Sequence, residues 1–338
     1  MLKYIEVKEE IKKMLSAMKE DDLLPTYAKL AYEFNVSDIT VRKALNELIK
    51  DGLIYGVRRK GIYKAKPKRT FLDVSLLTDL VYFNKNPEED INPGLMEALQ
   101  HDMIENDMDL ILSLTGCDPY REAVLLQKLL VRKPYGIIAN PFPTHENFDI
   151  YRNVASQFPN FVFVDKCIPG ADAHYVGTDN YNGAKKLIAE LDGEKFDKVF
   201  LLHSLSDYLL NSEEERLKGY KESLRNFGYN FIEYSDWADF VSDYKDTNEF
   251  KNKNIAFVVT CGIFFTWVYE GIKNSLLDSA NCKVVCFDKP QGDFPLNISV
   301  SWYRQPATII SKTAVELIRD NVKERQFLEF QGKIHHIN

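Results

Sequence analysis

Apolar residues recur every three or four positions along the first 50 residues of the chain, in three separate segments. This spacing predicts three short amphipathic helices that share one core. The second helix is expected from about Thr26 to Phe34, and only Asn35-Val36 separate it from the third. Thr26 and Ser37 are good N-cap residues, and the third helix should stop at Asp51-Gly52, where glycine can adopt the left-handed conformation. The residues expected to face the core are Ile5, Ile11, Met14, Leu15, Met18, Leu30, Phe34, Val41, Leu45, Leu48 and Ile49.

The pattern of a β-hairpin follows the third helix. Leu53 to Tyr55 form a first strand, Gly56 to Lys60 a turn, and Gly61 to Lys64 a returning strand. Two helices joined by a tight turn and followed by such a hairpin are typical of a winged helix-turn-helix, in which one helix enters the DNA major groove and the wing lies on the backbone. A charged surface without a partner remains the alternative if charge alone is considered. The expected DNA contacts are Thr26, Lys29, Ser37, Asp38, Thr40, Arg42, Lys43, Arg58, Arg59 and Lys60.

Short apolar runs alternate with helical patterns from residue 71 onward. This alternation predicts parallel β-sheets covered by helices, and the number of runs favours two α/β lobes over one sheet. We therefore expect a winged helix-turn-helix domain at 1–66, a basic linker at 67–70 and a two-lobed α/β domain at 71–338. The runs are VSLLTDL, DLILSLT, YGIIANPF, FVFVDK, HYVGTD, KVFLLHS, IAFVVT, KVVCFD and NISVSW.

The charge distribution agrees with this division. Residues 1–70 carry 16 Lys and Arg against 10 Asp and Glu, whereas the 338-residue chain has a net charge of −7. A basic head on an acidic body is consistent with a nucleic-acid reader fused to another module. The chain has no apolar run of about 18 residues, and its N-terminus has no apolar signal region, so we expect a cytoplasmic protein.

The sequence contains no recognisable catalytic or cofactor motif. No G-x-G-x-x-G follows a predicted strand and no G-x-x-x-x-G-K-[ST] occurs, so we expect no cofactor. The five cysteines form no C-x-x-C pair, which favours reduced thiols and no metal site. An enzyme that uses His203 with Asp79 or Asp165 as base and acid is an alternative without such support.

Polar and aromatic residues follow the predicted strands, where ligands of open α/β sheets bind. Their carboxylates and rings suit a ligand rich in hydroxyl groups. These residues are Asp79, Tyr82, Phe83, Thr115, Asn140, Asp165, Lys166, Asp179, His203, Thr260 and Asp288.

The head resembles the winged helix of the GntR family. The matching residues are Leu24-Pro25, Leu30-Ala31, Val36-Ser37, Thr40 to Leu45, Leu48, Gly52 to Ile54 and Gly61. The sequence departs from the family where Tyr27, Ala28 and Lys29 replace charged residues, and where Asp38 occupies an often basic position.

The body resembles the effector domain of the LacI/GalR family. The resemblance rests on HYVGTDNYNGAKKLIAELDG, ERLKGYKESLRNFG, FVFVDK, VVCFDK and ISVSWYRQPATIISKTAVELI, and it implies a periplasmic-binding-protein-like fold that dimerises. A winged-helix head on this body resembles GntR regulators of the arabinose-repressor type.

The resemblance also implies ligand-binding roles. Arg216 matches an arginine that grips sugar hydroxyls, Asp288 and Asp165 match aspartates of the site, and Trp237 falls near a stacking aromatic. Thr260 stands where asparagine is usual, and Lys166 and Lys289 replace an arginine and an aspartate. The expected ligand set is Asp79, Tyr82, Phe83, Thr115, Asp165, Lys166, His203, Arg216, Trp237, Thr260, Asp288 and Gln305.

Together these features predict a transcription regulator, by family habit a repressor, whose dimer binds double-stranded operator DNA. A sugar or sugar phosphate between the lobes would control that binding. The alternatives are a nucleoside or purine as effector, and a sugar-binding protein without a DNA function. Neither the operator, the sign of regulation nor a dimer as opposed to a tetramer follows from the sequence.

Overall fold

The computed structural model describes residues 3–19, 21–65, 72–78, 91–142, 144–203, 211–245, 249–272, 281–294 and 297–337. The chain divides into two compact units, Met1–Thr70 and Phe71–Asn338. The expected residues Asp79, Tyr82 and Phe83 lie outside the described residues.

The first unit contains the three expected helices and the hairpin. Ten buried residues form its core, and they come from all three helices, from Leu24 and from the first strand. The elements are α1 (Lys3–Ala17), α2 (Tyr27–Glu33), α3 (Asp38–Lys50), β1 (Ile54–Val57) and β2 (Gly61–Lys64).

Three details of the first unit differ from the expectation. Ile49 is 39% exposed because α3 buries Val41, Ala44, Leu45 and Leu48, and the next residue points about 100° away from that stripe. In α1, Val7 is buried whereas Ile5 is only half-buried. The first hairpin strand starts at Ile54 and runs on to Val57, so the turn is confined to Arg58, Arg59 and Lys60.

The second unit contains two six-stranded sheets, which confirms the two α/β lobes. All nine expected strands are present, and the first sheet is parallel throughout, in the order β13-β7-β6-β5-β3-β4. Its strands are β3 (Leu72–Thr78), β4 (Met108–Leu114), β5 (Gly136–Asn140), β6 (Phe161–Val164), β7 (His174–Thr178) and β13 (Phe327–Phe330).

The second sheet has the order β14-β12-β11-β10-β8-β9. All its pairs are parallel except β12 with β14, which is antiparallel. Its strands are β8 (Lys198–Leu202), β9 (Ile232–Tyr234), β10 (Asn254–Val259), β11 (Asn281–Phe287), β12 (Ile298–Arg304) and β14 (Lys333–Ile337).

The sequence did not predict β9, β13 or β14. These strands lie at the edges of the two sheets, are only partly buried and therefore contain no continuous apolar run.

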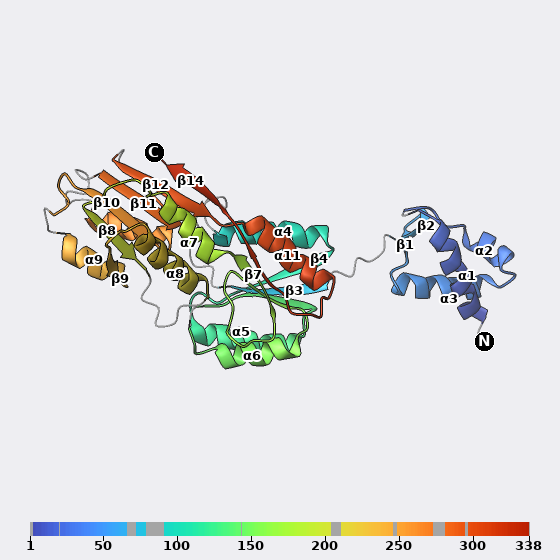
Figure 1. Ribbon diagram of the computed structural model, residues 1–338. Helices are drawn as coiled ribbons and strands as arrows, with labels where there is room; N and C mark the ends of the chain where they lie inside the picture. Colours follow the sequence, from blue (N-terminus) through green and yellow to red (C-terminus); the bar gives the residue numbers. More distant parts are fainter. Residues whose placement is uncertain are drawn as a thin grey trace. The chain divides into compact units, whose positions relative to one another are not determined.

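Helices cover both faces of each sheet (Figure 1). In the first lobe, α4 and α11 pack on one face and α5 and α6 on the other. In the second lobe, α7 and α8 cover one face and α9 and α10 the other. The bounds are α4 (Ile91–Glu105), α5 (Pro119–Arg132), α6 (Phe148–Gln157), α7 (Asn180–Ala189), α8 (Asn211–Asn226), α9 (Trp237–Tyr244), α10 (Gly262–Ile272) and α11 (Ala307–Arg319).

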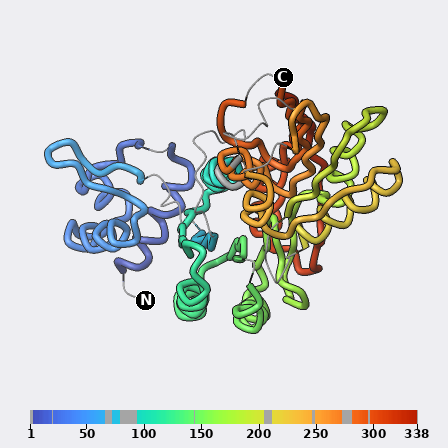
Figure 2. Tube along the Cα trace, turned by 90° about the vertical axis from the view of Figure 1, so that its left-hand side faces the viewer, coloured from blue at the N-terminus to red at the C-terminus, as the bar shows by residue number. Residues whose placement is uncertain are grey.

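The chain crosses three times between the lobes of the second unit. It crosses from β7 to α7, from β12 to α11, and from β13 to β14. In Figure 2 the last two crossings belong to the segment coloured orange to red. Residues near these crossings are therefore placed to respond to any change between the lobes.

No helix in the part of the chain that the structure describes is both long enough and apolar enough to cross a membrane.

Candidate functional site

The N-terminal end of α3 forms a polar, mostly exposed surface in the first unit. Ser37 caps the helix by accepting from the N–H of Thr40 at 3.4 Å, and the two hydroxyls lie 2.9 Å apart. The Arg42 guanidinium lies 4.5 Å from the ring of Tyr27, and the Lys43 amine lies 4.1 Å from the ring of Tyr4. These cation–π contacts hold two basic side chains against the faces of α2 and α1.

All ten expected DNA contacts are exposed, except Thr40, which is half-buried. Ile39, which is not among the expected contacts, is 78% exposed in the first turn of α3. An exposed apolar side chain at this end of a recognition helix can contact a thymine methyl group. The sequence already indicated that Ile39 would be exposed, because it does not belong to the helical repeat of the buried residues of α3.

The wing presents three adjacent cations at its tip, Arg58, Arg59 and Lys60. Its base is held by stacking of Tyr55 on Tyr63, with ring centroids 5.6 Å apart, and by a bridge between Leu23 and Tyr63. Gly61 has φ +127°, and a Cβ there would lie 2.6 Å from the Leu23 side chain. The tip can therefore lie on a phosphate backbone while the hairpin stays fixed to the helices.

Arg216 occupies the centre of a buried network in the second unit. It extends from α8, is only 6% exposed, and lies 4.1 Å from the ring of Phe287. Its guanidinium donates to the side chain of Asn180 at 2.8 Å, to the carbonyl of Thr260 at 3.2 Å, and to the side-chain oxygen of Gln305 at 3.0 Å. Because a buried cation is costly unless it is hydrogen-bonded, this network fixes the position of Arg216.

Gln305 connects this arginine to an aspartate and to the first crossing. Its side-chain oxygen also accepts from the hydroxyl of Thr178 at 2.8 Å. Its amide donates to both carboxylate oxygens of Asp288, at 3.1 and 2.8 Å. Thr178 ends β7 at the first crossing, and Gln305 lies in the second. A change at Arg216 or Asp288 would therefore reach two of the three connections between the lobes.

The structure thus brings together four of the twelve expected ligand residues: Arg216, Asp288, Gln305 and Thr260. Thr260 is 1% exposed, and its hydroxyl has no hydrogen-bond partner among the described residues. Asn180 and Thr178 belong to the same network and were not in the expected ligand set. The sequence could not identify them, because a polar residue at the start of a helix or at the end of a strand is common. Their role becomes visible only from the hydrogen bonds that the folded chain forms.

The other described members of the expected set lie elsewhere. Asp165, with φ +65°, is buried after β6, and Lys166 follows it. The Thr115 hydroxyl donates to the carbonyl of Thr78 beside β4. His203 lies 2.9 Å from Glu233 of β9, and the ring of Trp237 packs against Trp267 of α10.

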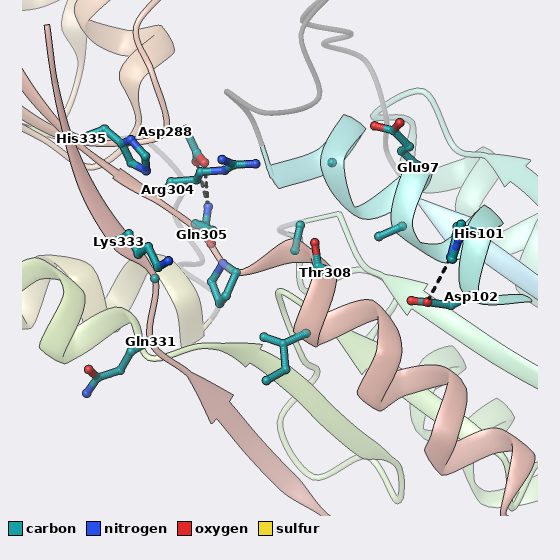
Figure 3. A pocket seen from close by; sticks show the side chains of 16 residues that line it. Glu97, His101, Asp102, Asp288, Arg304, Gln305, Thr308, Gln331, Lys333 and His335 are labelled. Carbon is teal, nitrogen blue, oxygen red and sulfur yellow. Dashed lines mark hydrogen bonds and ion pairs between the residues drawn. The ribbon is translucent and has the colours of Figure 1, made fainter. Parts of the chain in front are cut away.

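A cavity of about 730 Å³ lies beside the network (Figure 3). It is bordered by α4, by the crossing from β12 to α11, and by the crossing from β13 to β14. Asp288 and Gln305 line it, and so do Arg304, Lys333 and His335, which were not expected. A small polar ligand fits this volume.

Three of the five cysteines have raised thiol pKa values. Burial raises the pKa of Cys167 and that of Cys282 to about 12, and burial raises the pKa of Cys286 well above its usual value. These thiols are therefore protonated at neutral pH. Within the described ranges, no group of three or more His, Cys, Asp or Glu side chains is arranged to hold a metal ion.

Comparisons with known proteins define the class of each unit. Residues 3–63 match the family of bacterial regulatory proteins called the gntR family. The second unit has the fold of LacI-type regulators and sugar-binding proteins. The structure of the Cra transcriptional dual regulator from Pseudomonas putida, in complex with fructose 1-phosphate, aligns with a TM-score of 0.63 over 78% of this chain and 97% of that one, at 16% identity. A carbohydrate transporter solute-binding protein from Agrobacterium radiobacter, in complex with D-arabinose, gives a TM-score of 0.62 over 79% and 94%, at 13% identity.

Among individual proteins, the chain is similar to two arabinose metabolism transcriptional repressors. The repressor from Geobacillus stearothermophilus is 28% identical over 142 residues, which are 41% of this chain and 38% of that repressor. The one from Halalkalibacterium halodurans is 23% identical over 249 residues, 67% of this chain and 61% of its own length. The matched regions span less than two thirds of either repressor. The expected combination of a GntR-type head with a body of the LacI-type fold is confirmed.

Proposed function

We propose that this chain is a DNA-binding transcription regulator, and specifically a repressor, whose operator binding is controlled by a small carbohydrate or sugar phosphate. The observation that carries the proposal is the hydrogen-bonded network of Arg216, Gln305 and Asp288 at the lobe crossings, in a chain that also has a winged-helix head. The names of the two arabinose repressors support the sign of regulation and the ligand class.

In the proposed mechanism, ligand hydroxyls compete for the donors of Arg216 and the acceptors of Asp288. Both groups now bond to Gln305. A ligand that takes over these bonds changes the partners of Gln305 and, through it, those of Thr178. Ligand binding then favours one arrangement of the two lobes, which is a population shift between pre-existing states. The alternative is the same mechanism with a nucleoside or purine as the effector.

We further propose that the protein acts as a homodimer. Operators read by winged-helix dimers carry two half-sites at a fixed spacing. Leu112 and Leu114, 42% and 40% exposed, lie on the edge strand β4, and Ile104 of the adjacent α4 is 60% exposed. An exposed apolar sheet edge of this kind favours pairing with a second copy.

Thermal unfolding against a ligand panel tests the effector site. The panel holds arabinose and other monosaccharides, their phosphates, nucleosides and purines. A saturating ligand should raise the melting temperature of the protein, and Arg216→Ala should abolish the rise. Arg225→Ala, an exposed arginine on the same helix, is the matched control and should respond as the wild type does. A response that survives Arg216→Ala would place the ligand elsewhere.

Fluorescence anisotropy with duplex DNA tests the head. Affinity should fall steeply as salt rises, and Lys60→Ala should reduce the slope of log K against log salt by about 1, since one phosphate contact is lost. Lys50→Ala is the control because Lys50 lies at the other end of α3, paired with Glu47. A sugar-binding protein without a DNA function would show no binding at any salt concentration.

A further inference from the structure

Two like charges face each other in the second lobe. Arg304 of β12 and Lys333 of β14 are directly paired across antiparallel strands, so their side chains project from the same face of the sheet. Like charges in this position destabilise a sheet. Both side chains are exposed, and no ion pair of either is found among the described residues. An anion between the two side chains would relieve this repulsion.

Both cations border the cavity of about 730 Å³, and Figure 3 shows them on the same side of it. His335, two residues along β14, lines the cavity as well and is stacked on Trp302 with ring centroids 4.9 Å apart. The Nε2 atom of His335 is buried and has no hydrogen-bond partner within the described part of the chain. His335 therefore forms part of the cavity wall beside Lys333, on the same face of β14.

The N-terminus of α11 borders the same cavity. Pro306 is its N-cap and provides no side-chain cap, and Thr308 in the first turn lines the cavity. The positive end of a thirteen-residue helix favours a negative ligand.

Most of the acidic groups at the cavity are already engaged. Asp288 accepts from the amide of Gln305, and Asp102 accepts from the hydroxyl of Ser311 at 2.5 Å. Glu97 is the remaining carboxylate among the described residues of the lining. In the described part of the chain, neither cation is thus bonded to an acidic neighbour, and the polar pair of Asp288 and Gln305 lies within the same cavity.

We propose that Arg304 and Lys333 bind the phosphate group of a phosphate monoester, with Thr308 and the first turn of α11 supplying further donors. A guanidinium and an ammonium together match the several oxygens of a phosphate. The hydroxylated remainder of the ligand would extend toward Asp288 and Gln305. The identification of this ligand as the effector rests on the proposed function, whereas the phosphate site itself does not.

The test is titration of the full chain with inorganic phosphate at constant ionic strength, followed by calorimetry and by thermal unfolding. Wild-type protein should bind phosphate and melt at a higher temperature. Arg304→Gln and Lys333→Gln should each weaken phosphate binding about tenfold, because each variant loses one charge-assisted hydrogen bond to the phosphate. In chloride buffer without phosphate, each variant should melt no lower than the wild type, because the repulsion between the two cations is removed.

The control is Lys251→Gln combined with Lys312→Gln, which removes two exposed cations outside the cavity and should leave the phosphate response unchanged. Absence of phosphate binding by the wild type, or equal binding by the Arg304 and Lys333 variants, would overturn the proposal. A neutral sugar that binds through Arg216 while phosphate does not bind would remove this inference and keep the proposed function. Phosphate binding by a protein that responds to no sugar and binds no DNA would keep this inference and remove the proposed function.

Discussion

At the scale of single residues, His174 shows how burial and hydrogen bonds determine the protonation state of a side chain. It is fully buried at the start of β7, where its Nδ1 accepts from the N–H of Gln326 and its Nε2 lies 3.1 Å from the carbonyl of Val322. Because Nδ1 is an acceptor, Nε2 must carry the proton. Burial, and next the nearby charge of Arg325, lower the pKa of His174, and the hydrogen bond to the carbonyl of Val322 and the charge of Asp172 oppose them only in part.

This lowered pKa predicts acid sensitivity. The unfolded chain takes up the proton near pH 6.5, before the folded state does, so stability present above that pH is lost as the pH falls. The free energy of unfolding should therefore decrease from pH 7 to pH 5, and the decrease should be smaller in His174→Gln. His145→Gln, at an exposed position, is the control and should follow the wild type. Equal pH dependence in all three proteins, measured by urea unfolding, would contradict the assignment.

Gln305 is the second residue whose contacts give a quantitative expectation. Gln305→Ala would leave the buried side chains of Arg216 and Asp288 each without one partner, which should cost roughly 2–4 kcal/mol of unfolding free energy. Gln157→Ala, an exposed glutamine on α6, should change stability by less than about 0.5 kcal/mol. Urea unfolding measures both. A cost for Gln305→Ala as small as that of the control would mean that the network contributes little to stability.

At the scale of elements, the wing depends on backbone shape as well as on charge. Gly61 begins β2 with φ +127°, so a side chain there would be strained and would meet Leu23. Gly56 in the facing strand has an ordinary φ, and a Cβ added there would meet no atom within 4 Å. Gly61→Ala and Gly56→Ala therefore make the same chemical change, but only Gly61→Ala should disturb the backbone of the wing.

Gly61→Ala should weaken DNA binding and lower the salt slope, because the wing moves away from its place beside α3, while the charge of the head stays the same. The cost in stability should be about 1–2 kcal/mol. Gly56→Ala should retain the wild-type affinity and slope in the anisotropy experiment. Unchanged binding by Gly61→Ala would show that the wing does not contact DNA.

The elements also show where sequence patterns succeed. The helices of the head were predictable because their buried stripes repeat at helical spacing, and Ser37 and Gly52 mark the ends of α3. Eight of the nine predicted strands lie inside the sheets, where both faces of a covered strand are apolar, and the ninth, β4, lies at a sheet edge but is still rich in apolar residues. The edge strands β9, β13 and β14 were not predictable, because exposure on one side permits polar residues such as Lys333 and His336.

At the scale of the whole molecule, the proposed function requires that ligand and DNA binding be linked. If a ligand from the panel lowers DNA affinity by some factor, DNA must lower the affinity for that ligand by the same factor. Arg42→Ala should weaken DNA binding and leave ligand affinity in the absence of DNA unchanged. Calorimetry with and without duplex DNA measures the linkage. Ligand affinity that is identical in both conditions would mean that the two units act independently.

The sequence by itself determined the helices and hairpin of the winged head, nine of the twelve strands of the body and its two-lobed class, because these depend on local periodicity and on motifs within single segments. Only the tertiary structure decided the two arrangements on which the proposals rest. Arg216, Gln305 and Asp288 are far apart in the chain and meet only where the lobes are joined. Arg304 faces Lys333 only because β14 pairs with β12 in one register, and a shift of one residue would turn Lys333 to the other face.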